Sequence, residues 1–436
     1  MVARFGGEHG HAASDDVTSI YYNAAGLGFG HGYRAYLEGT LAYRTVDYDR
    51  DVDAIDNPGT GTPDDGISAN AGPAHLADTL VSPFVGAATD LGIRGLGLGF
   101  GVYAPFGGQA DWDKNDAYAG NTTYPGAVDG TQRWANISGL QRSIYFTLGA
   151  AYATPEGKLA FGASLSAIRS QIDLVRARNA TGTDDLLGEG RSLLEASDLT
   201  VGFGLGVMYR PDDKMTLGLS YQSRPGITKM SLDGTLTNRF GSGEVVQDVS
   251  LQQKLPDIVR FAVEIEVAPK VNVLAAFDWQ HWSVFDNQCL IDLTDATPGC
   301  VFNSDGSLDT GNGGSGVVVN LPRNWTNTHS LRGGLDYQAS AKLDLAASIT
   351  YDTNAVPDET IDPSLFDMNK IVAQGTADVD VTDMIGVSAT LGHVFYSDRT
   401  TQPRAVAPAP PSLNPDMAGT YAQSVSYLLL GVTAKL

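Results

Sequence analysis

Long apolar runs are missing from this chain of 436 residues. A membrane-spanning helix needs about 20 consecutive, mostly apolar residues, and no stretch of the sequence reaches that length. A barrel that crosses a membrane with strands needs no such run, because its apolar and polar side chains alternate and cancel in any window. Hydrophobic residues make up 42% of the chain and charged residues 18%, which suits that second class. The sequence therefore excludes a helical membrane protein and leaves a transmembrane β-barrel open.

Basic residues are also few. The chain has 28 Lys and Arg against 50 Asp and Glu, a formal net charge of -22. A protein that binds the phosphate backbone of a nucleic acid needs a basic surface, so we expect no nucleic-acid partner. Solvated acidic loops account for the charge.

Cysteine occurs only twice, at Cys289 and Cys300, inside one loop-like stretch. In an oxidising compartment these residues are expected to form a local disulfide that adds at most about 3 kcal/mol, with two free thiols as the alternative. An apolar signal-peptide core is also lacking after Met1, so we expect the numbering to begin at a mature or trimmed N-terminus.

Glycine, in contrast, is abundant and patterned between Arg94 and Gly108 (RGLGLGFGVYAPFGG). In an extended strand one face carries leucine, phenylalanine and valine, and the other carries only Gly95, Gly97, Gly99 and Gly101. Because glycine weakens a strand, this repetition indicates room left beside the backbone. Pro105 should interrupt the ladder. We predict a wall strand beside the route of an apolar ligand.

About fourteen stretches show strand-like alternation, and the connections between them are alternately short and long. Their apolar faces repeatedly end in Tyr or Trp, as in the aromatic belts of outer-membrane barrels. A soluble barrel or propeller is the alternative. The predicted strands are 33–49, 80–89, 94–108 (broken at Pro105), 143–154, 159–176, 201–209, 215–221, 259–267, 271–286, 328–338, 343–352, 369–381, 384–397 and 424–436.

Residues 1–32 differ from the rest, since they are small, polar and too few to build a core. We predict that they form a hatch inside a barrel made by residues 33–436. Charged residues on the lumen face of the strands could anchor this plug through hydrogen bonds and salt bridges. These residues are Arg34, Glu38, Arg44, Arg260, Glu264, Glu266, Arg332 and Asp336.

At four places the chain resembles the FadL-type family of outer-membrane transporters, which includes channels for long-chain fatty acids and aromatic hydrocarbons. The matching segments are Arg4-Phe5-Gly6-Gly7-Glu8 leading to Ser14-Asp15-Asp16, Tyr22-Asn23-Ala24-Ala25-Gly26-Leu27, Val102-Tyr103-Ala104-Pro105-Phe106-Gly107, and Leu255-Pro256-Asp257 ahead of Asp278-Trp279-Gln280-His281-Trp282-Ser283. Three features depart from the family pattern: Ala24 stands where proline is usual, the N-terminus matches only from Arg4, and the last residue is Leu436.

The resemblance implies an all-β, monomeric, fourteen-stranded barrel in the outer membrane of a Gram-negative bacterium, surrounded by lipid and lipopolysaccharide. It implies passive uptake of hydrophobic compounds, fatty acids first and monoaromatic hydrocarbons or alkanes second, with release sideways beside a kinked third strand. Gly95, Gly97, Gly99, Gly101 and Pro105 would then form the lateral gate, and Asn23, Ala24 and Ala25 the hatch turn. No cofactor and no enzymatic activity are expected.

An uptake channel needs an apolar pocket and, for a carboxylate, a cation. The pocket candidates are Phe5, Phe29, Tyr103, Phe106, Trp112 and Tyr118, which could equally pack the hatch or the loops. Arg169 is the first candidate cation, because a bulge near Ala167 would turn it inward; a snorkelling rim arginine is the alternative. Arg332 is the second, with a salt bridge to Asp336 or to the hatch as its alternative.

Two further functions remain open at this point, a general porin and an outer-membrane hydrolase. The only local catalytic set is His281 with Ser283 and Asp278, which also fits the edge of an aromatic belt. His9 and His11 are spaced as metal ligands in a weak site, and the Asp64–Asp65 and Asp184–Asp185 loops could bind Ca²⁺, although solvated loop tips are the simpler interpretation. We therefore expect no resident metal.

Overall fold

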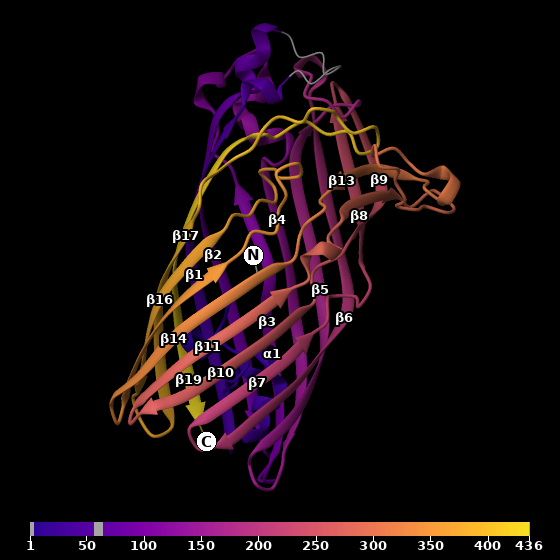
Figure 1. Cartoon of the computed structure of the whole chain (residues 1–436). Helices are drawn as coiled ribbons and strands as arrows, with labels where there is room; N and C mark the ends of the chain where they lie inside the picture. The colour runs from indigo at the N-terminus through magenta and orange to yellow at the C-terminus, as the bar shows by residue number, and fades with distance from the viewer. Residues whose placement is uncertain (1–3, 56–63, 436) are drawn as a thin grey trace.

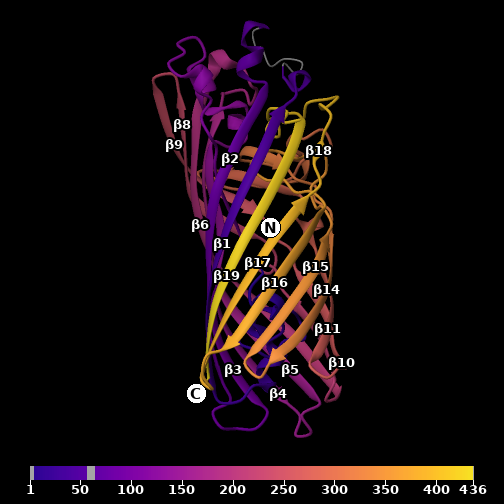
Figure 2. The same cartoon turned by 90° about the vertical axis from the view of Figure 1, so that its left-hand side faces the viewer.

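The computed structural model describes residues 4–55 and 64–435. Of the nineteen strands in this part, β8, β9, β12, β13 and β18 lie outside the ring, and the other fourteen close an antiparallel barrel (Figures 1 and 2). The ring runs from β1 to β7, then through β10, β11, β14, β15, β16, β17 and β19, and closes where β19 pairs with β1 along its whole length. The predicted barrel is confirmed.

The barrel strands are β1 (Tyr33–Arg50), β2 (Gly72–Thr89), β3 (Leu96–Asp111), β4 (Ser138–Ala153), β5 (Leu159–Arg178), β6 (Gly190–Asp212), β7 (Met215–Gln222), β10 (Ile258–Ala268), β11 (Val271–Gln280), β14 (Thr328–Ser340), β15 (Leu343–Asp352), β16 (Lys370–Asp380), β17 (Ile385–Tyr396) and β19 (Gly419–Lys435). Each overlaps a predicted stretch. β11 ends six residues before the predicted end at 286, and β2 and β6 begin eight and eleven residues earlier than predicted. These additions lie beyond the belt of exposed apolar side chains, where strands lose the alternation on which the prediction depended.

Alternation along the strands separates the outside of the barrel from its lumen. On β1, Leu37 and Leu41 are 55% and 48% exposed, whereas Glu38 between them is 1% exposed. Arg260 and Arg332 are likewise buried inside. Exposed tyrosines mark the rims of the apolar outer surface, at Tyr33, Tyr43, Tyr152, Tyr209, Tyr337 and Tyr351. This is the surface expected of a barrel in a lipid bilayer.

Short turns join the strands at one end of the barrel and long loops at the other; we call these the short-turn end and the long-loop end. At the long-loop end, β8 (Met230–Phe240), β9 (Gly243–Gln253), β12 (Asn287–Asp292) and β13 (Val317–Pro322) pair in turn beside the upper half of β6 and form a branch of the same sheet (Figure 1). β12 and β13 lie within residues 286–327, where the sequence predicts a long loop. The short strand β18 (Arg399–Thr400) pairs with β19.

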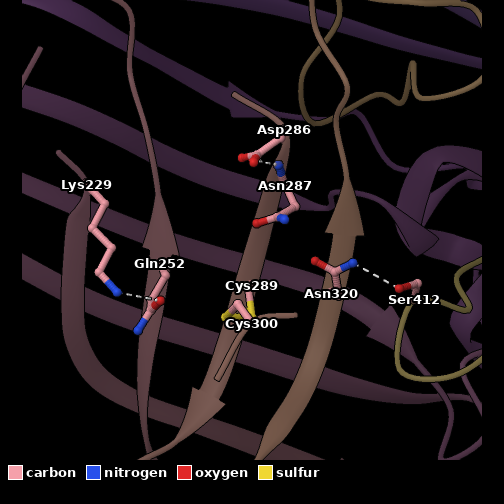
Figure 3. Close-up of a disulfide and its surroundings, with 8 residues drawn as sticks. All are labelled: Lys229, Gln252, Asp286, Asn287, Cys289, Cys300, Asn320 and Ser412. Carbon is pink, nitrogen blue, oxygen red and sulfur yellow. Dashed lines mark hydrogen bonds between the residues drawn. A yellow bond between two sulfur atoms is a disulfide. The ribbon is translucent and has the colours of Figure 1, made fainter. Parts of the chain in front are cut away.

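Cys289 on β12 forms a disulfide with Cys300 in the loop that follows this strand (Figure 3). Neither cysteine is free. The bond fixes the start of the loop that follows β12. Gln288, next to Cys289, is buried and faces the barrel lumen.

Residues 4–32, the N-terminal segment, lie inside the barrel as two 3₁₀ helices, η1 (Gly7–His9) and η2 (Ala24–Phe29), and one helical turn, α1 (Ser19–Tyr22) (Figure 1). Glycines on four strands let the segment approach the wall at backbone distance. A methyl group added at any of them would overlap the main chain or a short side chain of the segment; these glycines are Gly97, Gly162, Gly206 and Gly218.

The remaining 3₁₀ helices lie in the long loops or just beyond strand ends: η3 (Val52–Ala54), η4 (Asp64–Ala69), η5 (Asp116–Tyr118), η6 (Pro125–Asp129), η7 (Thr131–Trp134), η8 (Leu186–Gly188), η9 (Trp282–Val284) and η10 (Thr310–Asn312). Among the described residues, no helix has the length and apolar character needed to cross a bilayer.

Candidate functional site: an internal cavity beside a break in the wall

The ladder between β2 and β3 is interrupted. These strands pair only from Phe84–Tyr103 to Thr89–Leu98. Beyond that point β2 continues paired only with β1, and β3 continues paired only with β4, after a register shift between Tyr103 and Phe106. Pro83 and Pro105 stand at this break, and neither has an N–H to donate to a ladder. We call the gap between residues 79–83 and 104–110 the wall opening.

The wall opening has defined ends. At its lower end, the rings of Phe84 and Tyr103 stack with centroids 5.4 Å apart. At its upper end, Arg44 Nη2 donates to the Gln109 carbonyl oxygen at 2.6 Å, and the Asp111 N–H donates to Asp78 at 3.2 Å. The six-residue step from Asp78 to Phe84 corresponds to about 20 Å of strand.

A cavity of about 320 Å³ lies inside the barrel above the N-terminal segment. Arg4, Tyr21 and Tyr22 form its floor, and the long loops cover it. Its apolar walls include Phe106, Leu140, Ile172, Leu174, Leu255, Ile258, Trp282, Phe285, Leu321, Trp325, Leu365 and Phe366. Leu80, Gly107 and Gly108 from the edges of the wall opening also line it, so the cavity reaches the break in the wall.

Five arginines line this internal cavity, and four have partners. Arg4 lies 3.6 Å from Asp352, Arg44 lies 3.6 Å from Asp78, and Arg323 pairs with Asp362. Arg260 donates to Gln222 at 3.0 Å and lies over the ring of Tyr21. Arg176 on β5 has no hydrogen bond or ion pair within the described part of the chain. It is therefore the cation available to a ligand.

Of the six predicted pocket aromatics, the structure brings only Phe106 to the cavity. Phe5 and Tyr103 lie in the layer below, where Phe5 contacts Tyr21, Phe84 and Tyr103. Trp112 packs edge-on against Tyr48, Tyr118 lies among the long loops, and Phe29 lies under Arg210. These five follow the alternative considered above, packing of the segment and loops.

Neither of the two arginines that were predicted to bind a ligand carboxylate lines the cavity. The β5 ladder is regular on both sides through Ala167, so the expected bulge is absent there and Arg169 is exposed on the outer surface. Arg332 is buried, and its guanidinium binds the Glu8 carboxylate at 2.9 Å and the Gly10 carbonyl at 3.1 Å. Arg332 therefore holds the N-terminal segment, and both assignments are corrected.

The glycines proposed as a lateral gate lie below the wall opening. Gly97, Gly99 and Gly101 face Leu27 and Ile20 of the N-terminal segment, and Gly95 precedes β3 beside Ala153 with φ +79. The room that the sequence indicated is filled by the segment. Of the five gate residues, Pro105 is the one at the break.

The predicted hatch turn is held by Asn23. Its side chain donates to the carbonyls of Ala12 at 2.7 Å and of Val207 on β6 at 3.0 Å, and accepts from the Ala25 N–H at 3.2 Å. Ala24 and Ala25 are buried against Gly162. Asn23 thus ties the turn to the wall. In the family pattern a proline follows this asparagine, and here Ala24 takes its place.

The candidate catalytic set does not assemble. His281 Nδ1 lies 3.1 Å from Asp257, a carboxylate that also binds Arg224. Ser283 is tied instead through its backbone N–H to Asn327, and Asp278 lines the cavity. No hydrogen bond joins His281 to Ser283 within residues 4–55 and 64–435.

The metal candidates are also separated. His9 pairs with Asp378 at 3.1 Å, and His11 lies 4.0 Å from Glu264. Asp184 pairs with Arg50 at 2.8 Å, and Asp185 caps η8. The side chains of Asp64 and Asp65 lie outside the described residues. The described residues contain no group of three or more potential metal ligands.

Most residues of the cavity wall are not among the predicted site residues, although the sequence carries one signal for them. The side chains of Ser166, Ile168 and Ser170 on β5 face inward. The same alternation continues without a break, so Ile172, Leu174 and Arg176 face inward as well. A regular strand would therefore have predicted the apolar wall and its arginine. The residues from η9 and its flank, Trp282 and Phe285, carry no comparable pattern.

Residues 5–374 match the model of a family described as outer membrane protein transport protein (OMPP1/FadL/TodX). The chain belongs to this family. FadL-type proteins are outer-membrane channels for hydrophobic compounds, and the barrel described above is one of them. The long-loop end is accordingly extracellular and the short-turn end periplasmic.

Individual relatives agree with this assignment. Protein NMB0088 of Neisseria meningitidis serogroup B, whose name places it in the outer membrane, is 22% identical over 362 residues, which cover 79% of this chain and 73% of that protein. A Pseudomonas aeruginosa FadL homologue has a TM-score of 0.75 at 15% identity, covering 97% of this chain and 94% of its own. The Pseudomonas putida toluene transporter TodX has a TM-score of 0.66 at 15% identity, covering 100% and 97%. At such identities the two structures show a shared fold.

Proposed function

We propose that this FadL-type barrel takes up hydrophobic compounds passively, and that they leave sideways through the wall opening. One observation carries the proposal: the internal cavity is lined by both edges of the break between β2 and β3. A ligand there would reach the lipid phase without passing the N-terminal segment. An apolar molecule favours that exit, because the alternative route leads it into water.

Long-chain fatty acids are the ligand class that the cavity supports best. A cavity of about 150 Å³ already holds benzene, and the one here has about 320 Å³. Arg176 adds a cation that has no partner at contact distance. The carboxylate of a fatty acid would supply that partner. Monoaromatic hydrocarbons remain the second class, since TodX is named as a toluene transporter.

The N-terminal segment would act as the plug that distinguishes this channel from a general porin. It fills the lumen below the cavity and is fastened by buried contacts such as Arg332 with Glu8. We expect the barrel to work as a monomer among outer-membrane lipid and lipopolysaccharide, and to have no enzymatic activity.

Purified protein in liposomes tests the proposal. We expect palmitate and toluene to enter faster than in protein-free liposomes without an energy source, while sugars cause no swelling. Rapid sugar flux would instead indicate a general porin, and uptake of neither compound would reject the proposed function.

A further inference from the structure

A second hollow opens on the extracellular surface. This outer cleft has a volume of about 760 Å³ and lies between loops 281–327, 353–369 and 397–418. Its surface is partly apolar, with Phe302, Ile361 and Val406, and partly acidic, with Asp358 and Glu359. Val406 is 83% exposed. The cleft is therefore open to the medium and offers apolar contacts beside charged ones.

Only one layer of residues separates the outer cleft from the internal cavity. Both hollows are lined by Leu321, Arg323, Asp362, Asn414, Pro415 and Met417. These six residues come from the three loops that surround the cleft. We call this layer the partition.

Arg323 and Asp362 hold the partition together. Arg323 is 1% exposed, and its Nη1 donates to Asp362 Oδ2 at 2.6 Å. Its Nε and Nη2 both donate to Gln288 Oε1, at 2.9 and 2.7 Å. Gln288 Nε2 donates in turn to Gln253 Oε1 on β9 at 2.7 Å, and the next residue, Cys289, is bonded to Cys300 (Figure 3). The arginine is thus anchored on the β12 side, and the contact with Asp362 reaches across to loop 353–369.

Loop 353–369 has two different surfaces. Leu365 and Phe366 line the internal cavity, whereas Asp358 and Glu359 line the outer cleft. Asp362 lies between them and also accepts hydrogen bonds from the backbone N–H groups of Ser364 and Leu365, at 2.8 and 3.0 Å. Burial alone would raise the pKa of the Asp362 carboxyl, but Arg323 and Ser364 hold it below its ordinary value. The Asp362 carboxyl is therefore ionised at neutral pH.

We propose that the outer cleft is the vestibule through which ligands arrive and that the Arg323–Asp362 pair is its gate. This inference rests on the proposed uptake of hydrophobic compounds. A carboxylate ligand in the cleft replaces the Asp362 carboxylate on the guanidinium fork of Arg323, and Asp362 turns toward the water of the cleft. One anion is exchanged for another, so Arg323 is not left buried without a counter-charge. The side of loop 353–369 that carries Asp362 then moves away from Arg323, and the alkyl chain passes into the cavity.

This gate predicts a preference for acids. A neutral ester of the same length cannot compete for Arg323, because it lacks the charge that makes the exchange favourable. Palmitate should therefore enter several-fold faster than methyl palmitate in the unaltered protein. In Asp362→Asn the contact with Arg323 loses its charge, so both probes should enter several-fold faster and the preference should shrink.

The matched control is Glu244→Gln, on β9. The Glu244 carboxylate also pairs with an arginine, Arg239, but it is exposed and lines neither the cleft nor the internal cavity, so this variant should keep both the rate and the preference of the unaltered protein. Equal rates for the two probes before substitution, or no change in Asp362→Asn, would overturn the gate.

A blocking experiment tests the vestibule without touching the pair. Because both native cysteines are bonded, Val406→Cys provides a single reactive thiol in the cleft. A bulky maleimide on it should reduce palmitate uptake several-fold. The same reagent on Val245→Cys, an exposed site on β9 away from the cleft, should leave uptake unchanged.

The outcomes separate the two hypotheses. Full uptake after labelling of Val406→Cys would reject the vestibule while the proposed function stands. If the unlabelled protein carries neither palmitate nor its ester, the proposed function is rejected and the gate with it.

Discussion

Phe84 on β2 and Tyr103 on β3 form the last pair of their ladder, and their rings stack with an interplanar angle of 9°. The stack marks the lower end of the wall opening. Above it, the two strands separate at Pro83 and Pro105, and the internal cavity reaches the gap. Phe84 and Tyr103 both contact Phe5 of the N-terminal segment. The wall opening therefore begins just above the part of the lumen that this segment fills.

A bulky side chain in the wall opening should block release. A Cβ atom added at Gly108 meets nothing within 4 Å, and Gly108 lines the cavity, so Gly108→Trp should fill the gap without displacing the core. We expect palmitate uptake to fall by an order of magnitude or more while the barrel assembles normally.

Gly333→Trp is the matched control for that substitution. Gly333 lies on β14, and a Cβ atom added there also meets nothing within 4 Å. Its uptake should equal that of the unaltered protein. If Gly108→Trp also transports normally, the wall opening is not the exit.

The sequence was sufficient for the barrel because strand periodicity is a local property. Lipid outside and polar lumen inside impose opposite side-chain chemistry on successive residues, as Leu37 and Glu38 show. The strands β8, β9, β12 and β13 were missed because they lie beyond the membrane. Outside the membrane, neither face of a strand needs to be apolar. Pairing such as that of β12 with β9 also depends on residues distant in sequence.

The site was predicted less well because it depends on what fills the space beside each residue. The glycines of β3 leave room in the same way for a ligand or for Leu27, and only the folded chain shows that Leu27 is there. Because the β5 ladder is unbroken, Arg169 faces outward and Arg176, seven residues later, faces the lumen. A single bulge assumed between them reverses this prediction of which arginine faces inward. Family motifs located Pro105 and Trp282, but they did not specify the loops that close the cavity.

Arg332 should be required to keep the plug in place. Its buried guanidinium binds the Glu8 carboxylate and the Gly10 carbonyl, and removing one partner of a buried ion pair costs about 3–5 kcal/mol. We therefore expect Arg332→Ala to loosen residues 4–32 and to let sugars swell proteoliposomes. Arg239→Ala, which breaks an exposed pair with Glu244, should cause no leak. An Arg332→Ala barrel as tight as the unaltered protein would contradict this anchoring role.

Arg176 should distinguish acids from hydrocarbons inside the cavity. A hydrogen bond to a charged group contributes about 1.5–3 kcal/mol, so Arg176→Gln should weaken palmitate binding by roughly tenfold or more. Toluene binding should be unchanged, because it makes no use of the charge. Arg169→Gln, seven residues earlier on the outer face of β5, should alter neither ligand. Titration of both ligands into detergent-solubilised protein measures the effect, and an equal loss for toluene would exclude a head-group role.

Asp257 should give the extracellular half of the barrel a stability that depends on pH. Burial would raise the pKa of this carboxyl, but hydrogen bonds from Arg224 and His281 lower it from 3.8 to about 2. The backbone carbonyl of Asp257 also accepts from the His281 N–H at 2.9 Å, so the residue holds the start of the segment that carries Trp282 and Phe285.

Because the folded pKa lies below the unfolded value, the stabilisation is fully present above about pH 4 and disappears as the pH falls toward 2. Asp257→Asn should therefore lower the midpoint of thermal unfolding at pH 7, and the difference from the unaltered protein should vanish near pH 2. Asp383→Asn, an exposed turn residue at the opposite end of the barrel, controls for general loss of charge. A difference of the same size at pH 7 and at pH 2 would mean that packing, not the ionised carboxylate, holds the segment.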